Sequence, residues 1–143
     1  MNETGHIDFF YLNTGISGFS EERAREWIYN VVKREGGEVG SITCVFCDDD
    51  YLLHLNKTFL DHDTLTDIIS FDYTKELGGV SGDLFISVPT VIGNASTHNV
   101  SIEAEIHRVL VHGVLHLLGY DDKEAQARTL MRETENYYLS LLF

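Results

Sequence analysis

A helical pattern runs from Ser101 to Leu117 and ends at Gly119. Its apolar positions recur at intervals of three and four residues, which places them along one side of a helix. Gly119 suits the end of this helix because glycine tolerates the left-handed conformation that turns the chain back. The apolar positions are Ile102, Ile106, Val109, Leu110, Gly113 and Leu117. The pattern predicts a helix whose apolar side faces the core of the protein.

Shorter strand-like and helical patterns alternate through the rest of the chain. We expect strands over residues 7–12, 39–47, 66–73 and 83–88, and helices from Ser20 to the Gly36-Gly37 pair, over 48–59, over 89–95 and from about Lys123. Asp121 and Glu124 resemble a capping box for the last helix. This order indicates an α+β fold, with a small mixed sheet of about four strands packed with about five helices. No linker or repeat divides residues 1–143, so we expect a single domain.

The cysteines indicate the compartment. Cys44 and Cys47 lie three positions apart in an apolar run over 42–47. In a strand their side chains point to opposite faces, so they are poorly placed to form a disulfide or to chelate a metal. Buried free thiols suit a reducing cytoplasm. No segment approaches the length of a membrane span, and a cytoplasmic location with no membrane partner is expected.

The charge balance limits the partners. The 143 residues include 23 Asp and Glu against 10 Lys and Arg, a formal net charge of -13. Such a charge disfavours long-range attraction to phosphate backbones and anionic lipid. Four of the basic residues fall on the first helix and could form a local stripe. They are Arg23, Arg25, Lys33 and Arg34.

A cluster of metal-ligand types lies at the end of the central helix. His112 and His116 are one helical turn apart, so both imidazoles can reach one cation. Beyond Gly119, the carboxylate of Asp122 could return towards them, giving three ligands and an open position, as in catalytic zinc sites. The same ligand set occurs in non-haem iron sites, which leaves Fe²⁺ or another divalent ion open. The alternative is a chance pair, because the chain has seven histidines.

Residues 112–122, HGVLHLLGYDD, resemble the H-G-x-L-H-L-x-G-Y-D-H signature of the bacterial YbeY family. Residues 55–73, LNKTFLDHDTLTDIISFDY, and 82–87, GDLFIS, are similar to two further blocks of that family, in the same order. The resemblance implies a metal-dependent, single-strand-specific endoribonuclease of ribosomal RNA maturation and ribosome quality control. It also implies RNA as a partner, with ribosomal RNA and the small ribosomal subunit or associated proteins, and no DNA.

The resemblance assigns roles to single residues. His112 and His116 correspond to the first two metal ligands, and one Zn²⁺ per chain is expected. Asp122 stands where the family usually has a third histidine. A carboxylate can bind zinc, and it lowers the net charge of the site by one unit. Water bound to the ion should therefore be less acidic than in a site with three histidines.

A second difference from the family pattern concerns a residue expected to bind the phosphate of the substrate. Many family members carry an arginine where this chain has Leu60. Arg108, one turn before His112, is the candidate substitute and the only candidate catalytic side chain outside the metal ligands. The alternative for Arg108 is a surface ion pair with Glu105, three residues before it.

The mechanism expected from these residues depends on the ion. Peptidases with an H-E-x-x-H motif carry a glutamate where this chain has Gly113, which argues against peptide hydrolysis. The ion would polarise a phosphoryl oxygen and generate hydroxide from water. Asp67, Ser70 or Asp83 could orient a ligand histidine through its second ring nitrogen.

Two other functions remain open. One is a different metallohydrolase or a non-haem iron enzyme that uses the same triad. The other is a non-enzymatic ribosome-associated module, in which zinc only joins the last two helices. Because a bound cation reverses the local field in an acidic protein, we expect weak, metal-dependent and partner-assisted RNA binding.

Overall fold

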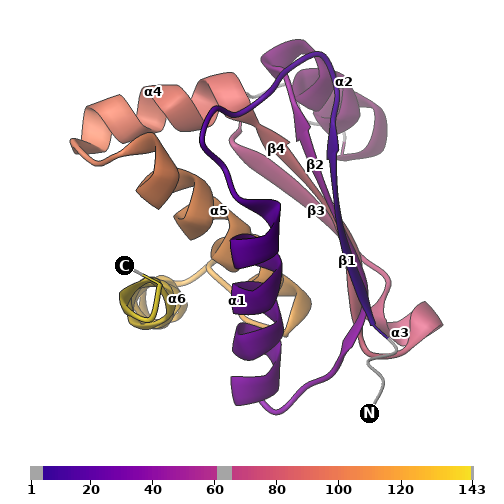
Figure 1. The fold of residues 1–143 in the computed structure, drawn as a ribbon. Coiled ribbons are helices and arrows are strands. Elements are labelled where there is room, and N and C mark those ends of the chain that lie inside the picture. Colours follow the sequence, from indigo (N-terminus) through magenta and orange to yellow (C-terminus); the bar gives the residue numbers. More distant parts are fainter. Residues whose placement is uncertain (1–4, 61–65, 143) are drawn as a thin grey trace.

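The computed structural model describes residues 5–60 and 66–142 (Figure 1). One four-stranded sheet has the order β1-β2-β4-β3. Its strands are β1 (His6–Tyr11), β2 (Val39–Cys47), β3 (Ile68–Asp72) and β4 (Val80–Ser87). β2 pairs in parallel with β1 and β4, whereas β3 pairs antiparallel with β4. The predicted mixed sheet of about four strands is confirmed.

Six helices accompany the sheet in the described ranges, where the sequence predicted about five. They are α1 (Glu21–Arg34), α2 (Asp49–Leu60), α3 (Thr74–Leu77), α4 (Val88–His98), α5 (Ile102–Leu117) and α6 (Ala125–Ser140). The unexpected helix is α3, which has only four residues and lies between β3 and β4. Throughout the described residues, every helix is too short or too polar to span a bilayer.

The helices cover both faces of the sheet. α1 and α5 lie on one face, and α2 lies on the other (Figure 1). Cys44 belongs to the large core on the α1 and α5 side, whereas Cys47 packs with Leu52 and Leu55 of α2. Both thiols are free and fully buried. The prediction that the two cysteines point to opposite faces is confirmed.

The helix predicted from the apolar pattern, α5, is the central helix of the core. Ser101 caps it by accepting a hydrogen bond from the Ala104 backbone N–H over 3.0 Å. Gly113 allows a close approach to the sheet, because a Cβ there would lie 2.8 Å from Cδ1 of Ile68 and 2.9 Å from Cδ2 of Leu84. α6 packs against α5 on the side away from the sheet (Figure 1). The helix that carries both histidines is therefore held from two sides.

The predicted capping box of the last helix is wrong. α6 begins at Ala125, and the Glu124 side chain makes no capping hydrogen bond. Asp121 instead accepts a hydrogen bond from the Lys123 backbone N–H over 3.0 Å. This bond is local because an aspartate readily closes a turn with the N–H two residues ahead. Asp121 therefore stabilises the turn between α5 and α6 rather than the start of α6.

Candidate metal centre

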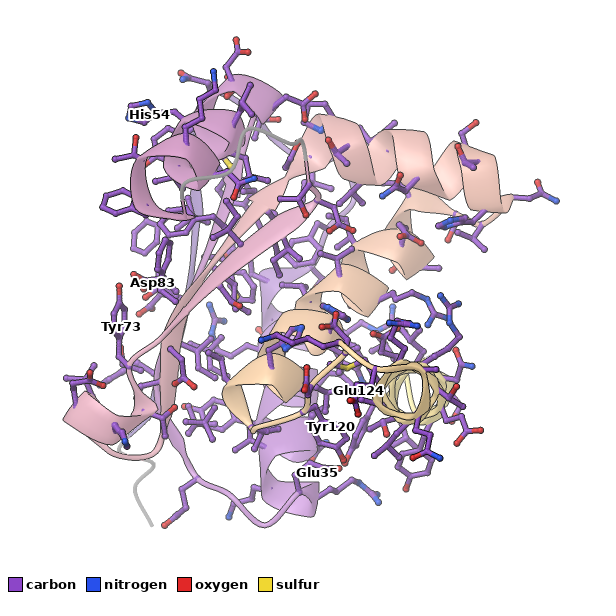
Figure 2. All side chains as sticks on the ribbon, turned by 180° about the vertical axis from the view of Figure 1, so that it is seen from behind. Glu35, His54, Tyr73, Asp83, Tyr120 and Glu124 are labelled. Carbon is purple, nitrogen blue, oxygen red and sulfur yellow. The ribbon has the colours of Figure 1, made fainter. Side chains whose placement is uncertain are left out.

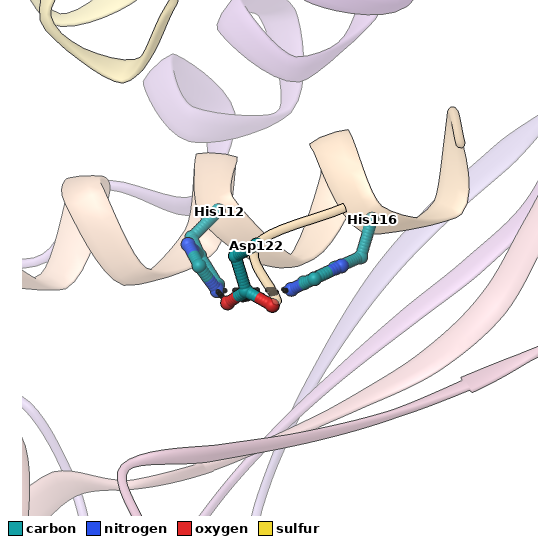
Figure 3. A group of neighbouring side chains, drawn as sticks. All are labelled: His112, His116 and Asp122. Atoms are coloured by element: carbon teal, nitrogen blue, oxygen red, sulfur yellow. Dashed lines mark hydrogen bonds and ion pairs between the residues drawn. The ribbon is translucent and has the colours of Figure 1, made fainter. Parts of the chain in front are cut away.

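The end of α5 and the turn after it bring the three predicted ligands together. Nε2 of His112 lies 3.1 Å from Nε2 of His116. Oδ2 of Asp122 lies 3.5 Å from both nitrogen atoms. Figure 3 shows the two rings on one side of α5 with the carboxylate between their tips. One ligand atom from each residue thus faces a common point.

The return of Asp122 depends on the tight turn at the end of α5. Gly119 has a φ of 105°, in the left-handed region. Its N–H donates to the His116 carbonyl over 3.0 Å, and the Tyr120 N–H donates to the Leu115 carbonyl over 2.9 Å. These bonds reverse the chain directly after His116. The predicted role of Gly119 is confirmed.

Hydrogen bonds on the far side of each ring fix its orientation. Nδ1 of His112 lies 2.7 Å from Oε2 of Glu135, and Nδ1 of His116 lies 3.0 Å from the Tyr120 carbonyl oxygen. A carbonyl and a carboxylate accept hydrogen bonds, so Nδ1 carries the hydrogen in the neutral, metal-binding form of each ring. The Nε2 lone pairs then face each other and the Asp122 carboxylate. Three acceptors that converge in this way are suited to a shared cation.

Burial and charge act against each other around Glu135. Burial raises the pKa of this carboxyl group, but hydrogen bonds from His112 and Arg108 outweigh burial and hold the pKa below its usual value. For His112, burial lowers the pKa, while Glu135, Asp122 and Asp67 together raise it above the usual value. The site therefore favours an ionised Glu135 beside His112.

Two residues of the triad, His112 and Asp122, line a cavity of about 790 Å³. Binding pockets for small ligands typically measure about 300–1,000 Å³, so the cavity can admit part of a polymer chain. His112 and Asp122 lie on one wall, Asp67 and Ile68 come from the start of β3, and α6 forms another wall. The α6 residues are Ala125, Arg128, Thr129, Met131, Arg132, Glu133, Glu135 and Asn136.

The family model for endoribonuclease YbeY matches residues 13–142. The chain belongs to the YbeY endoribonuclease family. A Cytophaga hutchinsonii endoribonuclease YbeY is 41% identical over 135 residues, which cover 94% of each chain. The Flavobacterium johnsoniae protein of that name is 46% identical over 135 residues, 94% of this chain and 96% of the relative. The Parabacteroides distasonis protein is 46% identical over 136 residues, 95% of each.

The fold has a solved counterpart. The solution structure of a Thermotoga maritima protein superimposes with a TM-score of 0.67 at 27% sequence identity. The match covers 94% of this chain and 88% of the other. The YbeY relatives and this structure therefore match nearly the whole length of the chain.

Arg108 lines the cavity but does not pair with Glu105. Its Nη1 donates to Oε1 of Glu135 over 2.9 Å, and its Nη2 donates to Oδ1 of Asn136 over 2.7 Å. Glu105 instead lies 3.7 Å from Nδ1 of His98. The alternative of an Arg108–Glu105 ion pair is therefore wrong. Arg108 and His112 share the two oxygens of one buried carboxylate.

Glu135 is the site residue that the sequence did not indicate. Asp67, Ser70 and Asp83 were the expected partners of the ligand histidines, but Glu135 and the Tyr120 carbonyl hold the rings. The spacing of Glu135 is the sequence signal that could have indicated it. Glu135 follows Met131 by four residues and precedes Tyr138 by three, which places all three on one side of a helix, and in the structure this side is buried. An acid at a core position of a helix requires a partner.

A second support reaches the site from α1. The Tyr120 hydroxyl donates to Oε1 of Glu35 over 2.7 Å, and the Tyr138 hydroxyl donates to the other oxygen of that carboxylate. Figure 2 shows Glu35 and Tyr120 side by side. Because the Tyr120 carbonyl is the acceptor for His116, this bond anchors the turn that orients the ring.

Three of the four basic residues of the first helix make structural contacts. Arg23 donates to Glu103 over 3.2 Å, Arg25 to the Ile7 carbonyl over 2.8 Å, and Arg34 to the Tyr137 hydroxyl over 3.1 Å. These hydrogen bonds tie α1 to its neighbours, so three of the four residues of the predicted basic stripe also have a structural role. The side chain of Leu60, the position where an arginine is usual in the family, lies outside the described part of the structure.

Proposed function

We propose that this chain cleaves single-stranded RNA at a divalent metal ion held by His112, His116 and Asp122. The observation that carries the proposal is the convergence of three ligand atoms at separations of 3.1 and 3.5 Å. Tetrahedral zinc ligands about 2.0–2.2 Å from the ion would lie roughly 3.3–3.6 Å apart. The donor set therefore fits one Zn²⁺ per chain. The same set would suit Fe²⁺ or another divalent ion.

When bound, the ion would supply a Lewis acid for the phosphodiester and would activate water. The residues of the chain supply orientation. Glu135 holds the ring of His112, and the Tyr120 carbonyl holds the ring of His116. We assign Arg108 a positioning role, because its guanidinium fixes Glu135 from the side opposite His112.

RNA as the substrate is supported by the relatives, which are named endoribonuclease YbeY. We propose ribosomal RNA as the target and the small ribosomal subunit or its proteins as partners. The two free buried thiols support a reducing compartment, in keeping with a cytoplasmic ribosome factor. We also propose that residues 1–143 act as one functional domain.

The test combines metal analysis with RNA cleavage on the same preparations. Wild-type protein should carry about one divalent ion per chain and cleave a short single-stranded RNA. His116→Ala should lose both properties. His54→Ala is the matched control, because His54 is exposed on α2, on the other face of the sheet from α5. Cleavage that survives complete metal removal would contradict the proposal. Iron content with oxygen consumption and intact RNA would indicate an iron enzyme instead.

A further inference from the structure

The cavity beside the triad gathers basic residues in an acidic protein. Three of the ten Lys and Arg residues of the chain line it, namely Arg108, Arg128 and Arg132. The net charge of the whole chain is -13, so long-range attraction of an anion to the protein is weak. A substrate phosphate bound in this cavity would meet its three arginines.

Two of these arginines form a row on α6. Arg128, Arg132 and Asn136 follow each other at intervals of four residues, and all three line the cavity. Residues four apart on a helix lie about 5–6 Å from each other on the same side. Arg108 reaches the end of this row from α5 through its 2.7 Å hydrogen bond to Asn136. The row therefore runs along one wall of the cavity to the site.

The three arginines differ in how much of their charge is balanced. Arg108 is paired with the buried Glu135. Arg128 donates one hydrogen bond, from Nη1 to the Lys123 carbonyl oxygen over 2.7 Å. Among the residues that the structure describes, no ion pair joins Arg128 or Arg132 to a carboxylate, and both side chains are exposed. These two guanidinium groups keep donors that face the cavity.

Five acidic residues also line the cavity, namely Asp67, Glu105, Asp122, Glu133 and Glu135. Glu135 lies between Arg108 and His112, Asp122 belongs to the triad, and Glu105 lies beside His98. Within the described residues, none of the five forms an ion pair with Arg128 or Arg132. An arginine presents a planar fork of N–H donors that matches two oxygens of a phosphate. An anionic chain with regularly repeated phosphates is therefore the ligand that suits two such forks one helical turn apart.

We propose that Arg128 and Arg132 bind neighbouring phosphates of the RNA strand whose scissile bond lies at the triad. This inference rests on the proposed function and names the residues that hold its substrate. It assigns the phosphate grip to α6, while Arg108 positions Glu135 and the arginines of α1 serve structural contacts. It also explains how a protein with a net negative charge could bind the negatively charged RNA strand at one place on its surface.

The test measures single-turnover cleavage of a short, end-labelled, single-stranded RNA by the metal-loaded protein. Arg128→Gln and Arg132→Gln should each raise the half-saturating protein concentration about tenfold, with maximum rate and metal content as in the wild type. In the double variant, the dependence of log affinity on log salt concentration should flatten by about 1.4, because each phosphate contact in a single strand contributes about 0.7. Arg132→Lys should fall between Arg132→Gln and wild type, because lysine keeps the charge but loses the fork.

Lys33→Gln is the matched control. It removes the same charge from an exposed position on α1, away from the cavity lining. Arginine variants that behave like Lys33→Gln, that lower only the maximum rate, or that lose metal would overturn the inference while leaving the proposed function intact. Anisotropy binding of the same RNA is measured in parallel. If the wild type does not cleave RNA, the proposed function fails, and phosphate binding by Arg128 and Arg132 is then judged from the anisotropy data alone. A lower RNA affinity in both arginine variants supports the inference, and an unchanged RNA affinity overturns it.

Discussion

The carboxylate of Glu135 holds His112 from the side of the ring that faces away from the triad, at 2.7 Å from Nδ1. Partners of this kind typically change metal affinity about 10–100-fold when they are lost. Glu135→Gln should therefore weaken metal binding by a factor in that range, measured by competition with a chelator. Glu133→Gln, on the same helix and in the same cavity, should bind metal as the wild type does. Equal losses in both variants would mean that cavity charge, and not the bond to His112, sets the affinity.

Asp121 and Asp122 are neighbours in the sequence but make different contacts. These contacts predict that Asp122 is the metal ligand and that Asp121 stabilises the turn. Asp122 lies 3.5 Å from both imidazoles, whereas Asp121 bonds to the Lys123 backbone. We expect Asp122→Ala to lose most of the bound metal after dialysis and Asp121→Ala to keep it. Metal analysis of the two dialysed proteins is sufficient. The reverse order would show that Asp121 is the ligand.

The bond between Tyr120 and Glu35 predicts a remote effect on the metal. Tyr120→Phe removes one hydrogen bond to a charged group, an effect of about 1.5–3 kcal/mol when such a bond is fully formed. Only part of this should reach the site, and we expect metal affinity to fall about fivefold. Tyr138→Phe is the control, since it loses its bond to the same carboxylate without touching the turn. It should lower thermal stability and leave metal affinity unchanged, and a loss of affinity in this variant would refute a role specific to Tyr120.

The two cysteines should be chemically inert in the folded protein. Burial raises the pKa of both thiols to about 12, so almost no thiolate exists at neutral pH. A thiol reagent should modify them slowly in buffer and within the mixing time in denaturant. Absorbance of the released chromophore gives both rates. Rapid modification of the native protein would mean that the sheet opens far more often than its packing implies.

His107 makes stability depend on pH. Burial lowers its pKa, an effect only partly offset by Glu103. Below about pH 6.5 this histidine is protonated in the unfolded chain but stays neutral in the folded chain. The stability of the folded protein is therefore unaffected by His107 above that pH and decreases as the pH falls below it. Urea unfolding at pH 7.5 and 5.5 should show a loss of at most about 1.4 kcal/mol per pH unit from this residue. His107→Phe should show a smaller loss, and an equal loss would assign the effect to other groups.

Features that depend on neighbours in sequence could be predicted. The β2 range, the helix with His112 and His116 on one side, and the turn at Gly119 follow from local periodicity and backbone preference. Glu135 could not be placed beside His112, because the two residues are 23 positions apart and no local pattern joins them. The contact of Glu35 with Tyr120 spans 85 positions and exists only after α1 and α5 have packed. Tertiary contacts of this kind also decided that Arg108 pairs with Glu135 rather than with Glu105.

The close approach of α5 to the sheet at Gly113 limits what this scaffold can become. A side chain at that position would meet Ile68 and Leu84 within 3 Å. A glutamate there would need room in an apolar layer that is already filled, and it would displace either these two side chains or the helix that carries both histidines. The change that would create a peptidase-like H-E-x-x-H sequence is therefore a step that the packing of this protein opposes. The short distance between α5 and the sheet at Gly113 therefore limits which side chains can stand next to His112.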